Sequence, residues 1–128
     1  MHKQNEPKNK SLLGQRINSF RYAFQGIFLA LRSEVHLQFH CIAALLVCAL
    51  GVWLGISRLE WFMVLVAISL VLVTELFNTA LEKLVDLVSP EEHTLAGQAK
   101  DIAAGTVLIA ALFAALTGGV VFCPYLLK

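Results

Sequence analysis

Four polar side chains follow a long uncharged run in the second half of the chain, and their types and spacing could support chemistry. Glu75, Asn78, Glu82 and Asp86 stand at intervals of three, four and four residues. On a helix this spacing places all four on one face. The preceding run, residues 61–73, carries no charge. Carboxylates at or near membrane depth cost ~2.5–3.5 kcal/mol each on insertion scales and by default indicate function.

The acidic residues fall at two depths, which suits phosphoryl transfer. Glu34 and Glu82 offer the hard oxygen ligands that Mg²⁺ binds together with substrate phosphates. Glu75 lies about 10 Å deeper than Glu82 along the same helix, at ~1.5 Å per residue, where it could act as a general base on an alcohol. Lys100 could supply a cation for phosphate oxygens, and Asp101 could orient it. Metal, cation and base are what phosphoryl transfer requires.

Other interpretations of these residues stay open. The charges could be ordinary interfacial residues, and Asn78 could be a hydrogen-bonding residue between helices. Membrane carboxylates also serve proton and ion pathways, so a non-enzymatic three-helix membrane protein is an alternative. His36 and His40 are four residues apart, a spacing that can ligate a metal, although no third ligand lies near them in the sequence. No GxxxxGK[ST] or GxGxxG motif is present, so composition and motifs do not predict ATP binding.

Composition and apolar runs predict the elements that position these residues. The chain has 128 residues, of which 58% are hydrophobic, whereas soluble domains are roughly 45–50% apolar. We expect an all-α membrane protein with a single domain over residues 11–128. Its predicted parts are a disordered leader (1–10), an amphipathic surface helix (about 11–32) and three transmembrane helices (about 35–56, 60–88 and 95–123). Pro124 is expected to end the last helix.

The predicted surface helix has an apolar stripe at helical spacing. The stripe consists of Leu13, Ile17, Phe20, Phe24, Ile27 and Leu31. Basic residues and aromatics beside it are typical of a helix lying on a membrane, and a helix that packs on a protein partner is the alternative. In the spans, Gly51 with Gly55 and two rows of alanine and glycine near the C-terminus indicate close helix packing.

The distribution of basic residues predicts the orientation. Six Lys or Arg residues precede the first span, and such residues favour the cytoplasmic side. No cleavable signal peptide is recognisable, so we expect a cytoplasmic N-terminus. Glu34, Glu82 and Lys100 then meet at one level near the cytoplasmic interface. The cysteines at 41, 48 and 123 lie in apolar runs without metal-ligand spacing, which is typical of buried or lipid-facing residues.

The core of the polar stretch, Glu75-Leu-Phe-Asn-Thr-Ala-Leu-Glu-Lys-Leu-Val-Asp86, resembles the signature of a known family. That family is the small bacterial membrane lipid kinases, the diacylglycerol kinase/undecaprenol kinase family. The resemblance covers residues 16–125. It continues through His93, Leu95, Ala96, Ala99, Lys100, Asp101, Ala104 and Gly105, and upstream through Tyr22, Gly26 and Glu34.

The resemblance implies a homotrimer in the bacterial inner membrane, with active sites shared between protomers and facing the cytoplasm. It implies transfer of the γ-phosphoryl group of MgATP to a lipid hydroxyl, with no nucleic acid partner. By position, Glu75 resembles the catalytic base with Asn78 near it, and Glu34 and Glu82 resemble the ligands of Mg²⁺ and the ATP phosphates. The nucleotide contacts would be Tyr22, Glu91, Glu92, His93, Lys100, Asp101 and, one position out of register, Arg16.

The entry to the first span suggests the branch of the family. Proteobacterial diacylglycerol kinases have a glutamate where this chain has His40. The segment at residues 33–40, together with Asn78-Thr79-Ala80, looks more like the undecaprenol kinase branch of Gram-positive bacteria. We therefore expect undecaprenol as the acceptor, with diacylglycerol as the alternative. The roles of His40 and Asp86 stay open.

Overall fold

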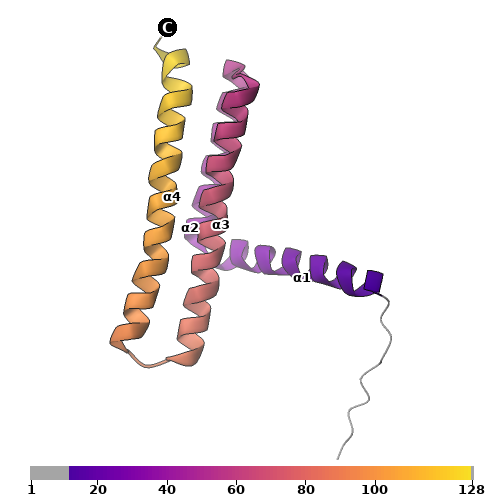
Figure 1. Cartoon of the computed structure of the whole chain (residues 1–128), viewed down its shortest axis with the longest axis vertical. Helices are drawn as coiled ribbons and strands as arrows, with labels where there is room; N and C mark the ends of the chain where they lie inside the picture. Colours follow the sequence, from indigo (N-terminus) through magenta and orange to yellow (C-terminus); the bar gives the residue numbers. More distant parts are fainter. Residues whose placement is uncertain (1–11, 128) are drawn as a thin grey trace, which may run out of the picture.

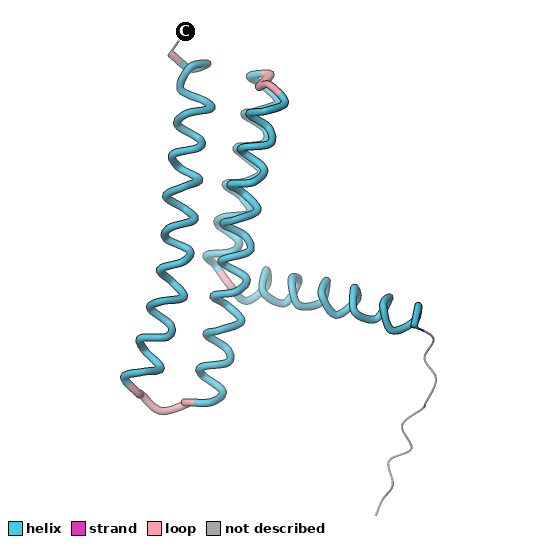
Figure 2. The backbone as a smooth tube through the Cα atoms, in the orientation of Figure 1, coloured by secondary structure: helices cyan, strands magenta, loops and turns pink. Residues whose placement is uncertain are grey.

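The structure is a computed structural model that describes residues 12–127, with side chains described from residue 14 onward. This part of the chain forms four helices joined by short loops (Figure 2). They are α1 (Leu12–Ser33), α2 (Val35–Leu54), α3 (Arg58–Val88) and α4 (Thr94–Leu126). The all-helical prediction is confirmed. The predicted leader and the first residue of the predicted surface helix lie outside the described residues.

The helices α2, α3 and α4 stand side by side, and α1 runs sideways from the foot of α2 (Figure 1). All three upright helices are long and apolar enough to cross a membrane. Most of their large apolar side chains face outward, as expected for helices surrounded by lipid. The three predicted spans therefore coincide with three helices of suitable length. The loop between α3 and α4 lies beyond the level of α1, at the end opposite the C-terminus (Figure 1).

A three-residue turn joins α2 to α3. Gly55 adopts the left-handed conformation, with φ 63° and ψ 44°, and so ends α2. Ser57 and Glu60 form a capping box that begins α3. These two signals start α3 two residues earlier, and end α2 two residues earlier, than predicted. Gly55 makes no close contact with another helix of this chain, because a Cβ there would meet nothing within 4 Å.

Close helix packing occurs at Gly51 instead. A Cβ at this position would lie 3.0 Å from Trp61 Cη2, so the glycine allows the indole ring of α3 to approach α2. Farther along, α4 packs on α3 around a cluster of Ile56, Val64, Val121 and Phe122. This cluster holds together the end of the bundle opposite the α3–α4 loop.

The last turn of α4 differs from the prediction, since the helix passes through Pro124 and ends at Leu126. Proline removes one backbone donor, and this loss is small in a final turn. The N–H of Leu127 still bonds to the carbonyl of Cys123 at 3.0 Å. Tyr125 donates a 2.8 Å hydrogen bond to Glu60 Oε2, which ties this turn to the start of α3.

Candidate functional site

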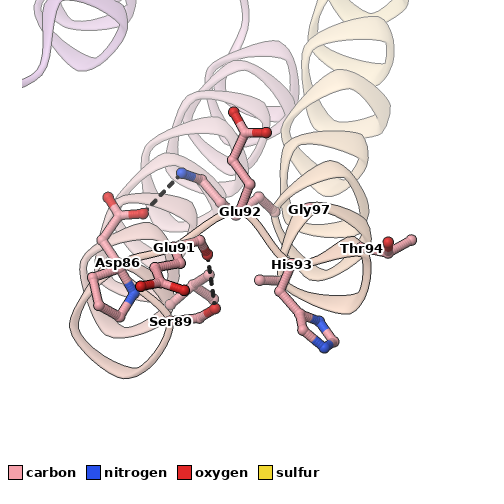
Figure 3. Close-up of a pocket in the computed structure, with 11 residues that line it drawn as sticks. Asp86, Ser89, Glu91, Glu92, His93, Thr94 and Gly97 are labelled. Carbon is pink, nitrogen blue, oxygen red and sulfur yellow. Dashed lines mark hydrogen bonds and ion pairs between the residues drawn. The ribbon is translucent and has the colours of Figure 1, made fainter.

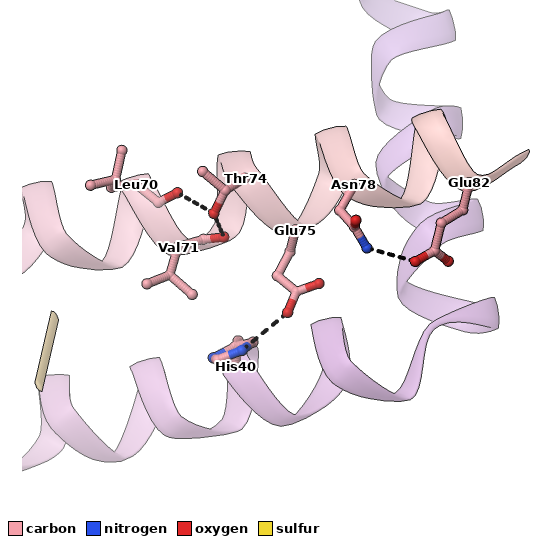
Figure 4. A network of polar contacts seen from close by, with 7 residues as sticks. All are labelled: His40, Leu70, Val71, Thr74, Glu75, Asn78 and Glu82. Carbon is pink, nitrogen blue, oxygen red and sulfur yellow. Dashed lines mark hydrogen bonds and ion pairs between the residues drawn. The ribbon is translucent and has the colours of Figure 1, made fainter. Parts of the chain in front are cut away.

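The polar face of α3 runs from the core to the surface of the bundle. Glu75 is buried, Asn78 and Glu82 are half-buried, and Asp86 is exposed. Their spacing on α3 places the four residues on one helix face, as predicted. They differ in burial and do not form one cluster. Glu75 faces α2, Asn78 contacts Glu82, and Asp86 pairs with a residue of α4 (Figures 3 and 4).

Glu75 belongs to the inward-facing stripe of α3, together with Val64, Ala67, Val71 and Thr79. Its Oε1 lies 3.1 Å from Nε2 of His40 on α2. Figure 4 shows the carboxylate directed away from its own helix toward the imidazole. A buried charge is costly unless it is paired and hydrogen-bonded, and His40 is the partner that reduces this cost.

The pairing of His40 with Glu75 was not predicted from the sequence. The signal that could have found it is the position of the turn between the two helices. Residues at similar distances before and after a tight turn face each other in an antiparallel pair, as Gly51 and Trp61 do around Ile56. His40 precedes Ile56 by 16 residues and Glu75 follows it by 19, so both reach nearly the same level.

One turn beyond Glu75, two half-buried side chains of α3 contact each other. Nδ2 of Asn78 donates a 2.9 Å hydrogen bond to Glu82 Oε1 (Figure 4). This bond orients the Glu82 carboxylate. The Oδ1 atom of Asn78 is buried and has no hydrogen-bond partner among the described residues, so it is an acceptor that a bound group could use.

Glu34 lies at the junction of α1 and α2, beside the same turn of α3. Its Oε1 accepts hydrogen bonds from Ser33 Oγ at 2.9 Å and from Lys83 Nζ at 3.1 Å. The Ser33 bond, and next the Lys83 bond, lower the pKa of Glu34 below its usual value. Lys83 directly follows Glu82 in the sequence. The contact with Lys83 therefore brings Glu34 to the turn of α3 that carries Glu82, the other predicted metal ligand.

These carboxylates fit a hard divalent cation only in part. No group of three or more His, Cys, Asp or Glu side chains within residues 12–127 could hold a metal ion. Mg²⁺ needs only one or two carboxylates when phosphates and water complete its shell. The donor chemistry of Glu34 and Glu82 is therefore suited to a metal bound together with a phosphate-bearing substrate, rather than to a closed protein site.

A polar cavity of about 570 Å³ lies where α3 meets α4 (Figure 3). Lys100 Nζ pairs there with Asp86 Oδ1 at 3.0 Å, so Asp86, rather than the predicted Asp101, orients the lysine. The role of Asp86, which the sequence left open, is therefore in part to bind Lys100. The cavity is lined by Val85, Asp86, Ser89, Pro90, Glu91, Glu92, His93, Thr94, Ala96, Gly97 and Lys100.

A second, mostly apolar cavity of about 310 Å³ lies between α1 and α3. The small residues Gly26 and Ala80 contribute to its lining, and Lys83 supplies a charge. Its complete lining is Tyr22, Ala23, Gly26, Ile27, Leu29, Ala30, Leu76, Thr79, Ala80 and Lys83. Two of the lining residues of α3, Leu76 and Thr79, lie within about one turn of Glu75 along the helix, but Glu75 itself does not line the cavity.

The two cavities separate the predicted nucleotide contacts. Glu91, Glu92, His93 and Lys100 line the polar cavity. Tyr22 lines the apolar one. Asp101 and Arg16 are exposed and line neither cavity.

Comparison with known proteins identifies the family. A family model described as prokaryotic diacylglycerol kinase matches residues 21–122. The chain belongs to the prokaryotic diacylglycerol kinase family. It is 36% identical over 118 residues to the undecaprenol kinase of Bacillus subtilis, covering 92% of this chain and 96% of that protein. It is 34% identical over 107 residues to the diacylglycerol kinase of Haemophilus influenzae, covering 83% and 91% respectively.

Membership in the prokaryotic diacylglycerol kinase family makes this chain a lipid kinase, and its three apolar helices fit a multi-pass membrane protein. The matched region contains all the candidate site residues from Tyr22 to Asp101. Arg16, the residue whose register did not fit, lies outside the matched region.

A third relative, the diacylglycerol kinase of Synechocystis sp., is 38% identical over 111 residues, which are 86% of this chain and 63% of that protein.

Proposed function

We propose that this lipid kinase transfers the γ-phosphoryl group of ATP to the hydroxyl of undecaprenol and forms undecaprenyl phosphate. The observation that carries the proposal is the position of Glu75. This carboxylate is buried on α3, within about one turn of residues that line an apolar cavity suited to a lipid, and the next turns of the same helix lead to a polar cavity suited to a nucleotide.

In the proposed reaction Glu75 accepts the proton of the lipid hydroxyl. The hydroxyl oxygen forms a bond to the γ-phosphorus, and the bond between that phosphorus and the bridging oxygen to the β-phosphate breaks, so that ADP leaves. Asn78 lies one turn from Glu75, and its unpaired Oδ1 could accept a hydrogen bond from a group bound there. A base in reach of the proton contributes typically 10²–10⁴-fold to rate.

We assign Glu34 and Glu82 to hold Mg²⁺ with the ATP phosphates. When bound, the ion would neutralise charge on the phosphates. Lys100 would contact phosphate oxygens, while the loop residues Glu91, Glu92 and His93 would lie near the nucleoside. Tyr22, Asp101 and Arg16 complete the proposed nucleotide contacts on the strength of sequence resemblance, because they do not line the polar cavity of the single chain.

The proposed setting is the bacterial inner membrane, with the N-terminus and the α3–α4 loop in the cytoplasm. Basic residues concentrate before α2, as expected for that side. Helix α1 would lie on the membrane surface with its apolar stripe toward lipid. Because the α3–α4 loop projects beyond the level of α1 (Figure 1), the polar cavity would then face water while Glu75 stays near the lipid boundary.

The acceptor is proposed from the relatives and from the entry to α2. Both an undecaprenol kinase and diacylglycerol kinases resemble this chain over most of its length. The segment around His40 favours undecaprenol, and diacylglycerol is the alternative acceptor.

Labelled ATP tests the proposal directly. Purified protein is incubated with γ-labelled ATP, Mg²⁺ and vesicles that contain either undecaprenol or diacylglycerol, with Glu75→Gln protein as the control. We expect label in undecaprenol at a higher rate than in diacylglycerol. Faster labelling of diacylglycerol would reverse the choice of acceptor. Label in neither lipid would contradict the proposed reaction with both acceptors.

A further inference from the structure

We propose that His40 is a positioning residue for the base of the phosphoryl transfer. Its Nε2 lies 3.1 Å from Oε1 of Glu75, and through this contact it holds the carboxylate so that the second oxygen, Oε2, is directed to the lipid hydroxyl. The inference rests on the proposed function, in which Glu75 is the base.

The carboxylate has few other means of being held. The Glu75 side chain is 7% exposed and that of His40 is 21% exposed, so water contributes little. Within residues 12–127, His40 is the only residue with a hydrogen bond or ion pair to Glu75. The hydroxyl of the adjacent Thr74 donates to the backbone carbonyls of Leu70 and Val71 (Figure 4). One imidazole therefore fixes the orientation of this carboxylate.

The nearby cations are engaged elsewhere. Lys83 pairs with Glu34 at 3.1 Å, and Lys100 pairs with Asp86 at 3.0 Å. Neither ammonium group can orient Glu75 while it makes these contacts.

The imidazole itself is well held. Its ring packs edge-on against Phe39, with 5.6 Å between ring centroids and an interplanar angle of 75°. It projects from α2, which is fixed against α3 by the close contact of Gly51 with Trp61. A donor carried on rigid elements keeps a reactive group in its productive geometry, and misplacement by about 1 Å can cost on the order of 100-fold in rate.

Rescue by a neutral donor provides a readout that a purely structural role would not move. An imidazole with its proton on Nε2 can donate toward Glu75 and leaves the carboxylate free to accept a proton. The other acids near these helices have partners of their own: Glu34 has Lys83, and Glu82 has Asn78. Among the described residues, no titratable group of α4 bonds to either member of the pair.

The test uses full-length protein in vesicles that contain undecaprenol, and compares His40→Ala with His40→Gln. The glutamine amide can donate from nearly the same place as Nε2. The matched control is His36→Gln, one turn earlier on α2, where the side chain is exposed. For each variant kcat and KM for ATP are measured.

We expect His40→Ala to lower kcat by on the order of 10- to 100-fold, with KM for ATP within about twofold. His40→Gln should recover most of kcat. His36→Gln should match wild type. Combined with Glu75→Gln, His40→Ala should cause no further loss, because its effect acts through that carboxylate.

Several results would overturn the proposal. A His40→Ala variant with wild-type kcat would do so, and so would a folded His40→Gln variant that is as slow as His40→Ala. If His40→Ala does not fold, the glutamine variant decides alone. Failure of the proposed function looks different: wild-type protein would label neither lipid, or Glu75→Gln would turn over normally.

Discussion

At the scale of single residues, the burial of Glu75 is the feature that sets this chain apart from a structural bundle. A hydrophobic residue of similar size at this position would avoid the cost of desolvating a carboxylate. The structure offers it one imidazole and no lysine or arginine among the described residues. Such an incompletely compensated acid in an apolar bundle indicates chemistry more than stability.

Replacing Glu75 by glutamine should remove the proposed base while conserving shape. We expect kcat to fall at least 10²-fold, which is the lower range for a lost general base. Nucleotide affinity should stay within about twofold, because the polar cavity contains no Glu75 atom. Single-turnover phosphoryl transfer and calorimetric ATP binding measure the two quantities. A near wild-type rate would exclude Glu75 as the base.

Replacing Glu82 by glutamine should affect the nucleotide instead. A neutral amide is a weaker ligand for Mg²⁺ than a carboxylate, so affinity for MgATP should fall by on the order of tenfold. Binding of ATP in the absence of Mg²⁺ should change much less and serves as the internal control. Equal MgATP affinities of variant and wild type would count against the metal role.

Glu34 predicts a pH dependence of stability in the absence of metal. Its pKa is lowered in the folded state by the bonds from Ser33 and Lys83. The ionised carboxylate therefore stabilises the fold above its ordinary value of 4.5, and this contribution is lost as the pH falls through the lower folded pKa. Because the pair is partly exposed, we expect less than about 1 kcal/mol.

Thermal unfolding of wild type and Glu34→Gln in metal-free buffer measures this contribution. Wild type should be slightly more stable near neutral pH, and the difference should disappear in acid. A difference that grows as the pH falls would have the wrong sign for a lowered pKa.

At the scale of elements, the α2–α3 turn sets the register on which the site depends. Gly55 ends one helix and the capping box of Ser57 with Glu60 begins the next. The register that follows brings His40 opposite Glu75. A turn longer by one residue would rotate or shift α3 and separate the two side chains.

The capping box should be important for stability and not for chemistry. Ser57→Ala removes the side-chain acceptor for the N–H of Glu60, and loss of such a cap costs about 1 kcal/mol. The activity of the remaining folded protein should equal that of wild type. Chemical unfolding with activity assays checks both, with Ser69→Ala, an exposed position within α3, as the control. No change in stability would show that the cap is dispensable.

At the scale of the whole molecule, one chain leaves much of α4 uncovered. Ala110, Ala114 and Gly118 are buried or half-buried, whereas Ala115 and Gly119 of the parallel row are exposed. Asp101, near the start of α4, is exposed and has no bonded partner among the described residues. The proposed homotrimer with shared sites would place these residues against a neighbouring chain.

Mixing two inactive variants tests whether sites are shared. Glu75→Gln affects α3, and Asp101→Asn affects α4. If one site combines α3 of one protomer with α4 of another, equal random mixing in a closed oligomer should restore about a quarter of wild-type activity. Glu75→Gln mixed with Glu82→Gln should give no more than the summed activity of the two parents, because both changes lie on α3. Activity no greater than the sum of the parents would contradict shared sites.

Much of the fold followed from local signals. Apolar runs long enough to span a membrane predicted α2, α3 and α4, with two of the six ends as predicted and the other four differing by one to three residues. The errors occurred where caps and turns decide the boundary, at Gly55, at Ser57 and at Pro124. Spacing alone also placed Glu75, Asn78 and Glu82 on one face, because helical periodicity depends only on position along the chain.

The amino-acid sequence by itself determined the helices, the family and the two depths of the acidic residues, since hydropathy and periodicity are properties of short segments. Only the tertiary structure decided the partners of these acids. It paired Glu75 with His40, Glu34 with Lys83 and Asp86 with Lys100. Each pair joins residues that are far apart in the sequence, on or next to different helices. Their formation depends on turn geometry and packing register, which the pattern of one segment does not contain.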